Sequence, residues 1–177
     1  MQQPIFQKSK DKVPFYLIVQ PQGTLISYQN KLGLVEDSNR KAFNYLLDKL
    51  RERNFYLHIY VPKTTEINEE ELYEFLSKDL QVKDVPMIEF SDTKIDDISE
   101  EVKHIAQHVA TPNYLIVDSL YDFVNLEIDD TAKYEGYNYI LCNPIYGLLK
   151  EDLDRLLTSI DDYSFQYNQT QVIKYTN

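Results

Sequence analysis

The sequence predicts an α/β fold, a three-layer sandwich in which a mainly parallel sheet is flanked by helices on both faces. The main observation is that short apolar runs typical of buried strands alternate with amphipathic helical stretches. A length of 177 residues also suits one well-buried core and is too short for two ordinary domains. We therefore expect a flexible N-terminus over 1–12, a single domain over 13–160 and a C-terminal tail over 161–177. For the tail, an edge strand, a docking arm and disorder remain open.

The first half of the chain is predicted to alternate two strands with two helices. Val13–Val19 is a continuous apolar run that ends at Pro and Gly, as expected of a strand buried on both faces. Asp37–Arg53 places its apolar residues on one helical stripe, and Phe55–Val61 is predicted to form the second strand. A second helix is expected over Asn68–Leu80, which opens on an Asn followed three residues later by Glu71, a capping-box-like start.

The second half continues the same alternation. Strands are predicted over Val85–Phe90, Tyr114–Val117 and Tyr137–Cys142. Helices are predicted over Asp96–Ala110 and Leu148–Ile160, whose apolar residues recur at helical spacing. In parallel α/β folds the ligand cleft lies beyond the carboxyl ends of the strands. The segments that follow the first and fourth strands are therefore the places to look for chemistry.

Charge and cysteine content restrict the possible partners and compartment. The chain has 29 Asp and Glu against 18 Lys and Arg, a formal net charge of -11, so it repels nucleic-acid phosphates and anionic membrane surfaces. We expect neither nucleic acid nor a membrane as partner. The single cysteine, Cys142, excludes an internal disulfide and is expected to be a small core residue. This cysteine usage, with no apolar run long enough for a membrane span and no signal-peptide pattern, predicts a cytoplasmic protein.

Three short segments stand in an informative order. The first predicted strand is followed by Gln20-Pro21-Gln22-Gly23-Thr24-Leu25, the fourth by Asp118-Ser119-Leu120-Tyr121-Asp122, and Lys94 lies just before the third helix. This layout resembles the haloacid dehalogenase-like (HAD) superfamily over roughly residues 13–145. Members of that family carry an Asp-x-Asp-Gly-Thr-Leu loop, a Lys and a carboxylate pair at these places. The resemblance implies a HAD-like, Rossmann-like sheet, and the short segments between the elements imply that no cap domain is present.

The resemblance also identifies what is missing. In the family the first Asp attacks the phosphorus atom, and the second Asp acts as general acid and base. Mg²⁺ neutralises the charge of the phosphoryl oxygens, and the Lys stabilises the negative charge that develops during the reaction. Here Gln20 and Gln22 replace the two aspartates, and a carboxamide is a poor nucleophile that does not titrate near neutral pH. The resemblance therefore implies a degenerate cleft, with no catalytic residue and no cofactor expected. Its expected members are Gln20, Gln22, Thr24, Lys94, Asp118 and Asp122.

Our main hypothesis is a catalytically inactive HAD-like domain, a pseudophosphatase that acts by binding a protein partner or a second copy of itself. The alternative is a residual Mg²⁺-dependent phosphohydrolase or a phospho-ligand sensor that uses Lys94, Asp118 and Asp122, with the two aspartates as weak metal candidates. Lys94 is also expected to neutralise Asp118 when no metal is bound. Under a plainer interpretation, Gln20 and Gln22 are turn residues of an unrelated α/β domain, and Asp118 is a helix N-cap.

Two further groups of residues have weaker signals. His104 and His108 are four residues apart on the third predicted helix, a spacing compatible with zinc. No Cys or third His lies near them in the sequence, so we interpret them as the polar flank of the helix. The chain is also rich in tyrosine, and tyrosine is enriched at protein interfaces. The candidates for a binding surface on the predicted flap and tail are Tyr28, Tyr163, Tyr167 and Tyr175.

Overall fold

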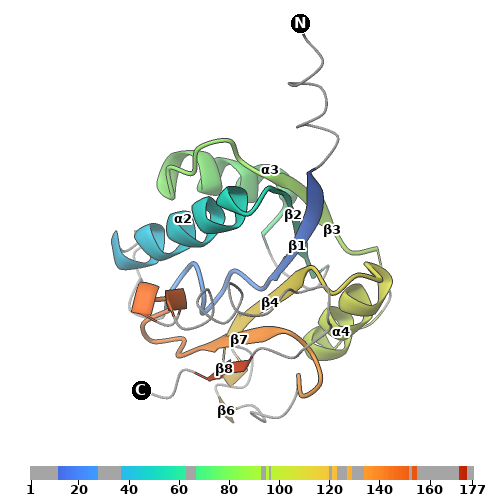
Figure 1. Ribbon diagram of the computed structural model, residues 1–177. Helices are drawn as coiled ribbons and strands as arrows, with labels where there is room; N and C mark the ends of the chain where they lie inside the picture. The colour runs from blue at the N-terminus through green and yellow to red at the C-terminus, as the bar shows by residue number, and fades with distance from the viewer. Residues whose placement is uncertain are drawn as a thin grey trace, which may run out of the picture.

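A central parallel sheet with helices on both faces forms the body of the protein (Figure 1). The computed structural model describes residues 12–27, 37–62, 67–92, 95, 97–119, 121–122, 127–128, 134–151, 153–154 and 172–174. The strands of the main sheet are β1 (Val13–Val19), β2 (Phe55–Val61), β3 (Met87–Phe90), β4 (Tyr114–Ser119), β7 (Tyr139–Cys142) and β8 (Val172–Lys174). They lie in the order β3-β2-β1-β4-β7-β8, and every neighbouring pair is parallel. The predicted three-layer α/β fold is confirmed.

The two faces of the sheet carry separate apolar clusters. On one face, α2 (Asp37–Glu52) and α3 (Glu69–Glu74) pack over strand residues such as Phe15 and Leu17. On the other face, α4 (Ile98–His108) packs over residues such as Ile18. Neighbouring residues of a strand point to opposite faces of the sheet, and helices cover both faces. For this reason β1 is apolar at nearly every position. Each fully buried aliphatic or aromatic side chain of this kind stabilises the fold by roughly 1.5–3 kcal/mol.

The predicted start at Asn68 is confirmed, and the helix predicted from Asp96 begins at Ile98. The side chain of Asn68 accepts a hydrogen bond from the backbone N–H of Glu71 at 2.8 Å, which caps α3. The side chain of Asp97 accepts one from the N–H of Glu100 at 2.9 Å, which caps α4. The second helix differs from the expected form, because α3 passes into a π-helical segment over Phe75–Asp79. The predicted strand starting at Val85 begins only at Met87, after Pro86, which has no N–H to donate to a neighbouring strand.

Strand β4 is longer than the sequence predicted. It continues to Ser119, so Asp118 lies inside the strand and not in the loop that follows. A short antiparallel pair comes next, β5 (Tyr121–Asp122) with β6 (Glu127–Ile128), which the sequence analysis did not anticipate. Asp118 is therefore not a helix N-cap, and that interpretation was wrong.

The last part of the chain is described in pieces. Within the predicted helix over Leu148–Ile160, residues 150–151 and 153–154 are helical, while Leu148 and Leu149 are described and are not helical. Residues 152 and 155–160 lie outside the described residues. Within the predicted tail, Val172–Lys174 forms β8 at one edge of the sheet, parallel to β7. None of the described helices is long and apolar enough to cross a membrane. Most of the segment 26–36, where a short flap was expected in place of a cap domain, lies outside the described residues.

Candidate functional site

The first and fourth strands are neighbours at the centre of the sheet, and the order of the strands reverses between them. Strands β2 and β3 lie on one side of β1, and strands β7 and β8 lie on the opposite side of β4. Counted along the chain, the main-sheet strands follow the order 3-2-1-4-5-6 of a Rossmann-like sheet. In such sheets ligands bind beyond the carboxyl ends of the strands at this reversal point. The two segments selected from the sequence therefore meet where a ligand cleft is expected.

Gln20 and Asp118 are brought together at this point. The backbone N–H of Gln20 donates to the carbonyl of Val117 at 3.0 Å, immediately beside Asp118. Gln20 lies two residues after Ile18, and Asp118 lies two residues after Ile116. Because every second residue of a strand points to the same face, both belong to the face of the sheet that α4 covers. Their side chains are almost completely buried, with residue exposures of 6% and 5%. The polar pair thus sits in the floor of the site, beneath the molecular surface.

The loop after β1 is a closed turn built on one carbonyl group. The carbonyl of Pro21 accepts the backbone N–H groups of Thr24, Leu25 and Ile26 at 3.3, 3.0 and 3.0 Å. Gly23 supports the turn at a φ of 86°, a left-handed conformation that favours glycine. The hydroxyl of Thr24 donates to the carbonyl of Gln20 at 2.6 Å, and Thr24 is fully buried. Thr24 therefore holds the turn in shape.

A second loop fastens this turn from the side of β7. Asn39 of α2, fully buried, donates through its side-chain amide to the carbonyls of Tyr146 at 2.7 Å and Leu148 at 2.9 Å. The N–H of Leu148 in turn donates to the carbonyl of Thr24 at 2.8 Å. Between them, Gly147 has a φ of 70°, and a Cβ there would lie 2.6 Å from both the Asn39 Nδ2 and the Thr24 carbonyl oxygen. We call this arrangement the loop clamp.

Sequence reasoning missed Asn39 and Gly147, which both belong to the loop clamp. Neither residue was selected from the sequence. The available signal was their surroundings: an Asn at a buried position of an amphipathic helix requires hydrogen-bond partners, and a glycine in a turn often marks close backbone approach.

Both carboxylate oxygens of Asp118 accept hydrogen bonds. Oδ2 accepts from the phenol of Tyr134 at 2.6 Å, and Oδ1 accepts from the backbone N–H of Ser119 at 2.7 Å. Tyr134 is itself fully buried, and its ring centroid lies 5.8 Å from that of Tyr139. The carboxylate is thus satisfied and oriented by protein groups. Sequence spacing gave no signal for Tyr134, which lies 16 residues beyond Asp118 after a second sheet has formed.

Glu101 adds an unexpected carboxylate at the same level. It lies in the first turn of α4 and is fully buried. It precedes Ile105 by one helical turn, and Ile105 packs in the same cluster as Ile18 and Ile116. Because α4 starts at the edge of the sheet where the strands end, this turn is at the level of Gln20 and Asp118 on the same face. Glu101 was not selected from the sequence.

Several predicted residues cannot be placed. Lys94 and the four tyrosines at 28, 163, 167 and 175 lie outside the described residues, as does the side chain of Asp122, whose backbone belongs to β5. The neutralisation of Asp118 by Lys94 stays a prediction. Gln22 is described and half-buried, beside the turn that Pro21 closes. Cys142 is buried within the core, and its expected role as a small core residue is confirmed.

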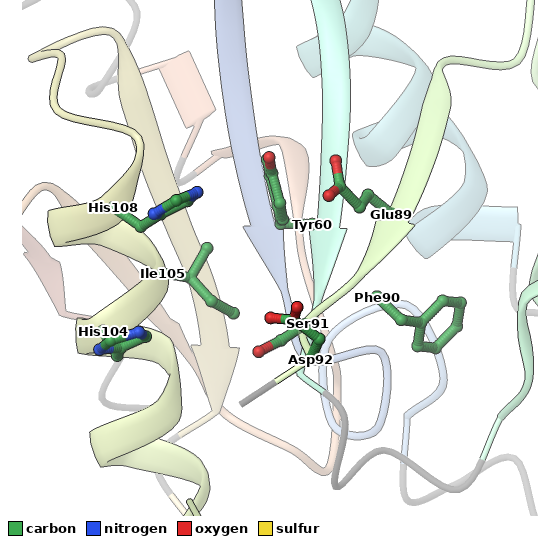
Figure 2. Close-up of a pocket in the computed structure, with 8 residues that line it drawn as sticks. All are labelled: Tyr60, Glu89, Phe90, Ser91, Asp92, His104, Ile105 and His108. Carbon is green, nitrogen blue, oxygen red and sulfur yellow. The ribbon is translucent and has the colours of Figure 1, made fainter. Parts of the chain in front are cut away.

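The surroundings of His104 and His108 include more than the expected polar flank. Both are exposed on α4, as expected of a polar flank, and they also line a pocket between α4 and the ends of β2 and β3 (Figure 2). The other residues that line it are Tyr60, Glu89, Phe90, Ser91, Asp92 and Ile105. In the part of the chain that is described, no group of three or more His, Cys, Asp or Glu side chains is placed to hold a metal ion.

Fold and site together define a three-layer α/β protein with a Rossmann-like parallel sheet and a buried polar site at the reversal of its strand order. No known protein family, curated protein or solved structure matches the chain.

Proposed function

We propose that the protein is a catalytically inactive HAD-like domain that acts by binding a protein partner or a second copy of itself. The observation that carries this proposal is the pair Gln20 and Gln22 at the end of β1, in a sequence order that otherwise resembles a phosphoryl-transfer site. A carboxamide in place of the nucleophilic Asp removes the group that forms the covalent intermediate. Loss of such a group typically lowers a rate by several orders of magnitude.

The environment of Asp118 supports the same proposal. A carboxylate that holds Mg²⁺ directs an oxygen toward the ion and the substrate. In this chain one oxygen accepts from Tyr134 and the other from the backbone of Ser119, and the residue is only 5% exposed. The Tyr134 phenol and the Ser119 N–H therefore each occupy one lone pair of the carboxylate and fix its orientation. These contacts favour a structural role for Asp118.

Exposed apolar side chains beside the candidate site support binding. Ile145 and Tyr146 are 37% and 38% exposed, and the backbone of Tyr146 is held by Asn39 in the loop clamp. A rigid turn that displays an aliphatic and an aromatic side chain needs little ordering on association, which favours affinity. We expect a partner to contact this turn. The paired variants Ile145→Ser and Tyr146→Ser should then weaken self-association or partner capture, measured by sedimentation equilibrium and by affinity purification.

Thermal stability with added ligands separates this proposal from the alternatives. A domain that acts only by protein binding should show no change in melting temperature with Mg²⁺ or orthovanadate. A phospho-ligand sensor should be stabilised by orthovanadate without hydrolysing a phosphate ester, and a residual phosphohydrolase should be stabilised and also hydrolyse one. The double substitution Gln20→Asp and Gln22→Asp is an informative rescue, because recovered hydrolysis would support the HAD-like resemblance directly.

A further inference from the structure

The pocket beside α4 is separate from the loop that follows β1. Figure 2 shows that His104, Ile105 and His108 come from α4 on one side, while Tyr60 of β2 and Glu89 of β3 come from the sheet on the other. Ser91 and Asp92 continue from the end of β3 between them. The cavity has a volume of about 70 Å³. Because one water-sized group needs about 10–15 Å³, the pocket has room for a head group of a few heavy atoms, not for a whole metabolite.

One wall of the pocket is an aromatic surface. The rings of His58 and Tyr60 are stacked, with centroids 4.8 Å apart and an interplanar angle of 13°. Tyr16 lies against both rings, at 5.5 Å from His58 and 5.8 Å from Tyr60. Stacking of this kind limits the movement of the Tyr60 ring, which lines the cavity. The wall is therefore formed before any ligand arrives.

The carboxylate of Glu89 lies beside this wall. One of its oxygens lies 3.2 Å from the Nε2 of His58, and the Tyr60 phenol is hydrogen-bonded to the same side chain. Burial and this hydrogen bond to Glu89 raise the pKa of Tyr60 to about 12, so the phenol remains protonated and donates to the carboxylate. Glu89 is nevertheless half exposed, at 53% of its side chain. It retains lone pairs that face solvent.

The two carboxylates of the pocket are matched to a ligand that donates hydrogen bonds and carries positive charge. Glu89 and Asp92 contribute carboxylates, which only accept hydrogen bonds when ionised, and the eight lining residues include no Lys or Arg. A cation near an aromatic face gains further attraction. A guanidinium group is planar, has four heavy atoms and donates in a fork that matches carboxylates, so it fits both the size and the chemistry.

We propose that this pocket binds the guanidinium group of an arginine side chain presented by a partner polypeptide. The inference gives a chemistry to the partner and so rests on the proposed binding function. It does not depend on the loop after β1, and turnover of a phosphate ester would contradict the proposed function without changing the measurement below. A metal ion is the competing occupant of a site with two histidines, but no set of three ligating side chains converges on one within the described residues.

The test is a titration of the ¹⁵N-labelled chain with N-acetyl-arginine amide, followed by ¹H–¹⁵N NMR. We expect saturable shifts at Tyr60, at 89–92 and at 104–108, and none with the uncharged isostere N-acetyl-citrulline amide. Glu89→Gln should weaken binding about tenfold, because it removes a charge-assisted hydrogen bond. The matched control is Glu70→Gln, an exposed acidic residue of α3 on the opposite face of the sheet, which should leave binding unchanged.

Three results would overturn the inference. The first is the absence of saturable shifts in these residues. The second is an equal response to the citrulline compound, since that would show that charge does not matter. The third is binding that Glu89→Gln leaves unchanged, because the proposal requires the charge of the Glu89 carboxylate. A saturable response to Zn²⁺ alone, lost in His104→Ala, would assign the pocket to a metal instead.

Discussion

The phenol of Tyr134 donates a 2.6 Å hydrogen bond to the carboxylate of Asp118, and both residues are buried at the carboxyl end of β4. This contact joins a strand residue to an irregular segment that follows a separate two-stranded sheet. It shows how the chain satisfies a buried carboxylate at the end of a central strand. The first prediction concerns this pair.

Tyr134→Phe should lower the free energy of unfolding by roughly 1–3 kcal/mol, because it removes a donor from a buried carboxylate while keeping the ring. Urea denaturation followed by circular dichroism measures the difference. Tyr73→Phe is the matched control, since Tyr73 lies on α3 and is 53% exposed. It should change stability by less than about 0.5 kcal/mol. If the two substitutions had equal effects, the Tyr134 hydrogen bond would not matter for stability.

The loop clamp predicts an unusual cost for losing Asn39. Its side chain serves two backbone carbonyls, and both would be left without their donor in Asn39→Ala. We expect a loss of about 2–4 kcal/mol by the same denaturation experiment. Asn44→Ala on the same helix removes one partly buried bond, to the carbonyl of Leu80 at 3.1 Å, and should cost about 1 kcal/mol. An Asn39 variant no less stable than the Asn44 variant would contradict the clamp.

Gly136 and Gly147 have similar backbone conformations, so a comparison of their alanine variants distinguishes steric crowding from backbone strain. Gly136 has a φ of 89°, and a Cβ added there would meet no atom of the described residues within 4 Å. A Cβ at Gly147, in contrast, would meet Asn39 and Thr24 at 2.6 Å. Gly136→Ala should cost about 1–2 kcal/mol from the left-handed conformation alone. Gly147→Ala should cost clearly more, because the clamp must also move. Equal melting temperatures for the two variants would show that the approach at Gly147 is not tight.

Tyr60 should give a distinct alkaline titration. Burial, and after it the hydrogen bond to Glu89, raise the pKa of Tyr60 from 10.0 to about 12 in the folded chain. The unfolded chain loses this proton first, so the contribution of Tyr60 to stability is complete below pH 10 and is lost as the pH rises toward 12. The native chain should therefore lose stability relative to Tyr60→Phe over this range. A Glu89→Gln variant should lower the Tyr60 pKa by only part of this shift, because burial, the larger cause, remains; ultraviolet titration against the Tyr60→Phe baseline measures it. An unchanged value would contradict the contact.

The sequence predicted the fold better than the site. An apolar run such as Val13–Val19 reflects burial of a strand on two faces, and a helix start such as Asn68 depends on a local hydrogen bond. Both can therefore be inferred from residues that are close in the sequence. The contacts that shape the site join distant segments. Asn39 reaches a carbonyl 109 residues away, and Tyr134 reaches back across 16 residues. No local period or spacing encodes such pairs, and they appear only once the strand order brings the segments together.

The histidine pair illustrates the same limit. Its spacing on one helix face was visible in the sequence, but the residues opposite it, Tyr60 and Glu89, come from two other strands. Sequence reasoning could weigh only ligands close in the chain and therefore favoured an inert polar flank. Strands β2 and β3 supply the opposite wall, and with it an acidic and aromatic pocket.

The most direct test of the central proposal is a Mg²⁺-dependent phosphatase assay on the purified chain, with a generic phosphate ester as substrate. An inactive binding domain should show no turnover above the no-protein control, and Asp118→Asn should behave identically. The contradictory result is Mg²⁺-dependent hydrolysis by the native chain that disappears in Asp118→Asn, since that would require Asp118 to serve catalysis despite its contact with Tyr134.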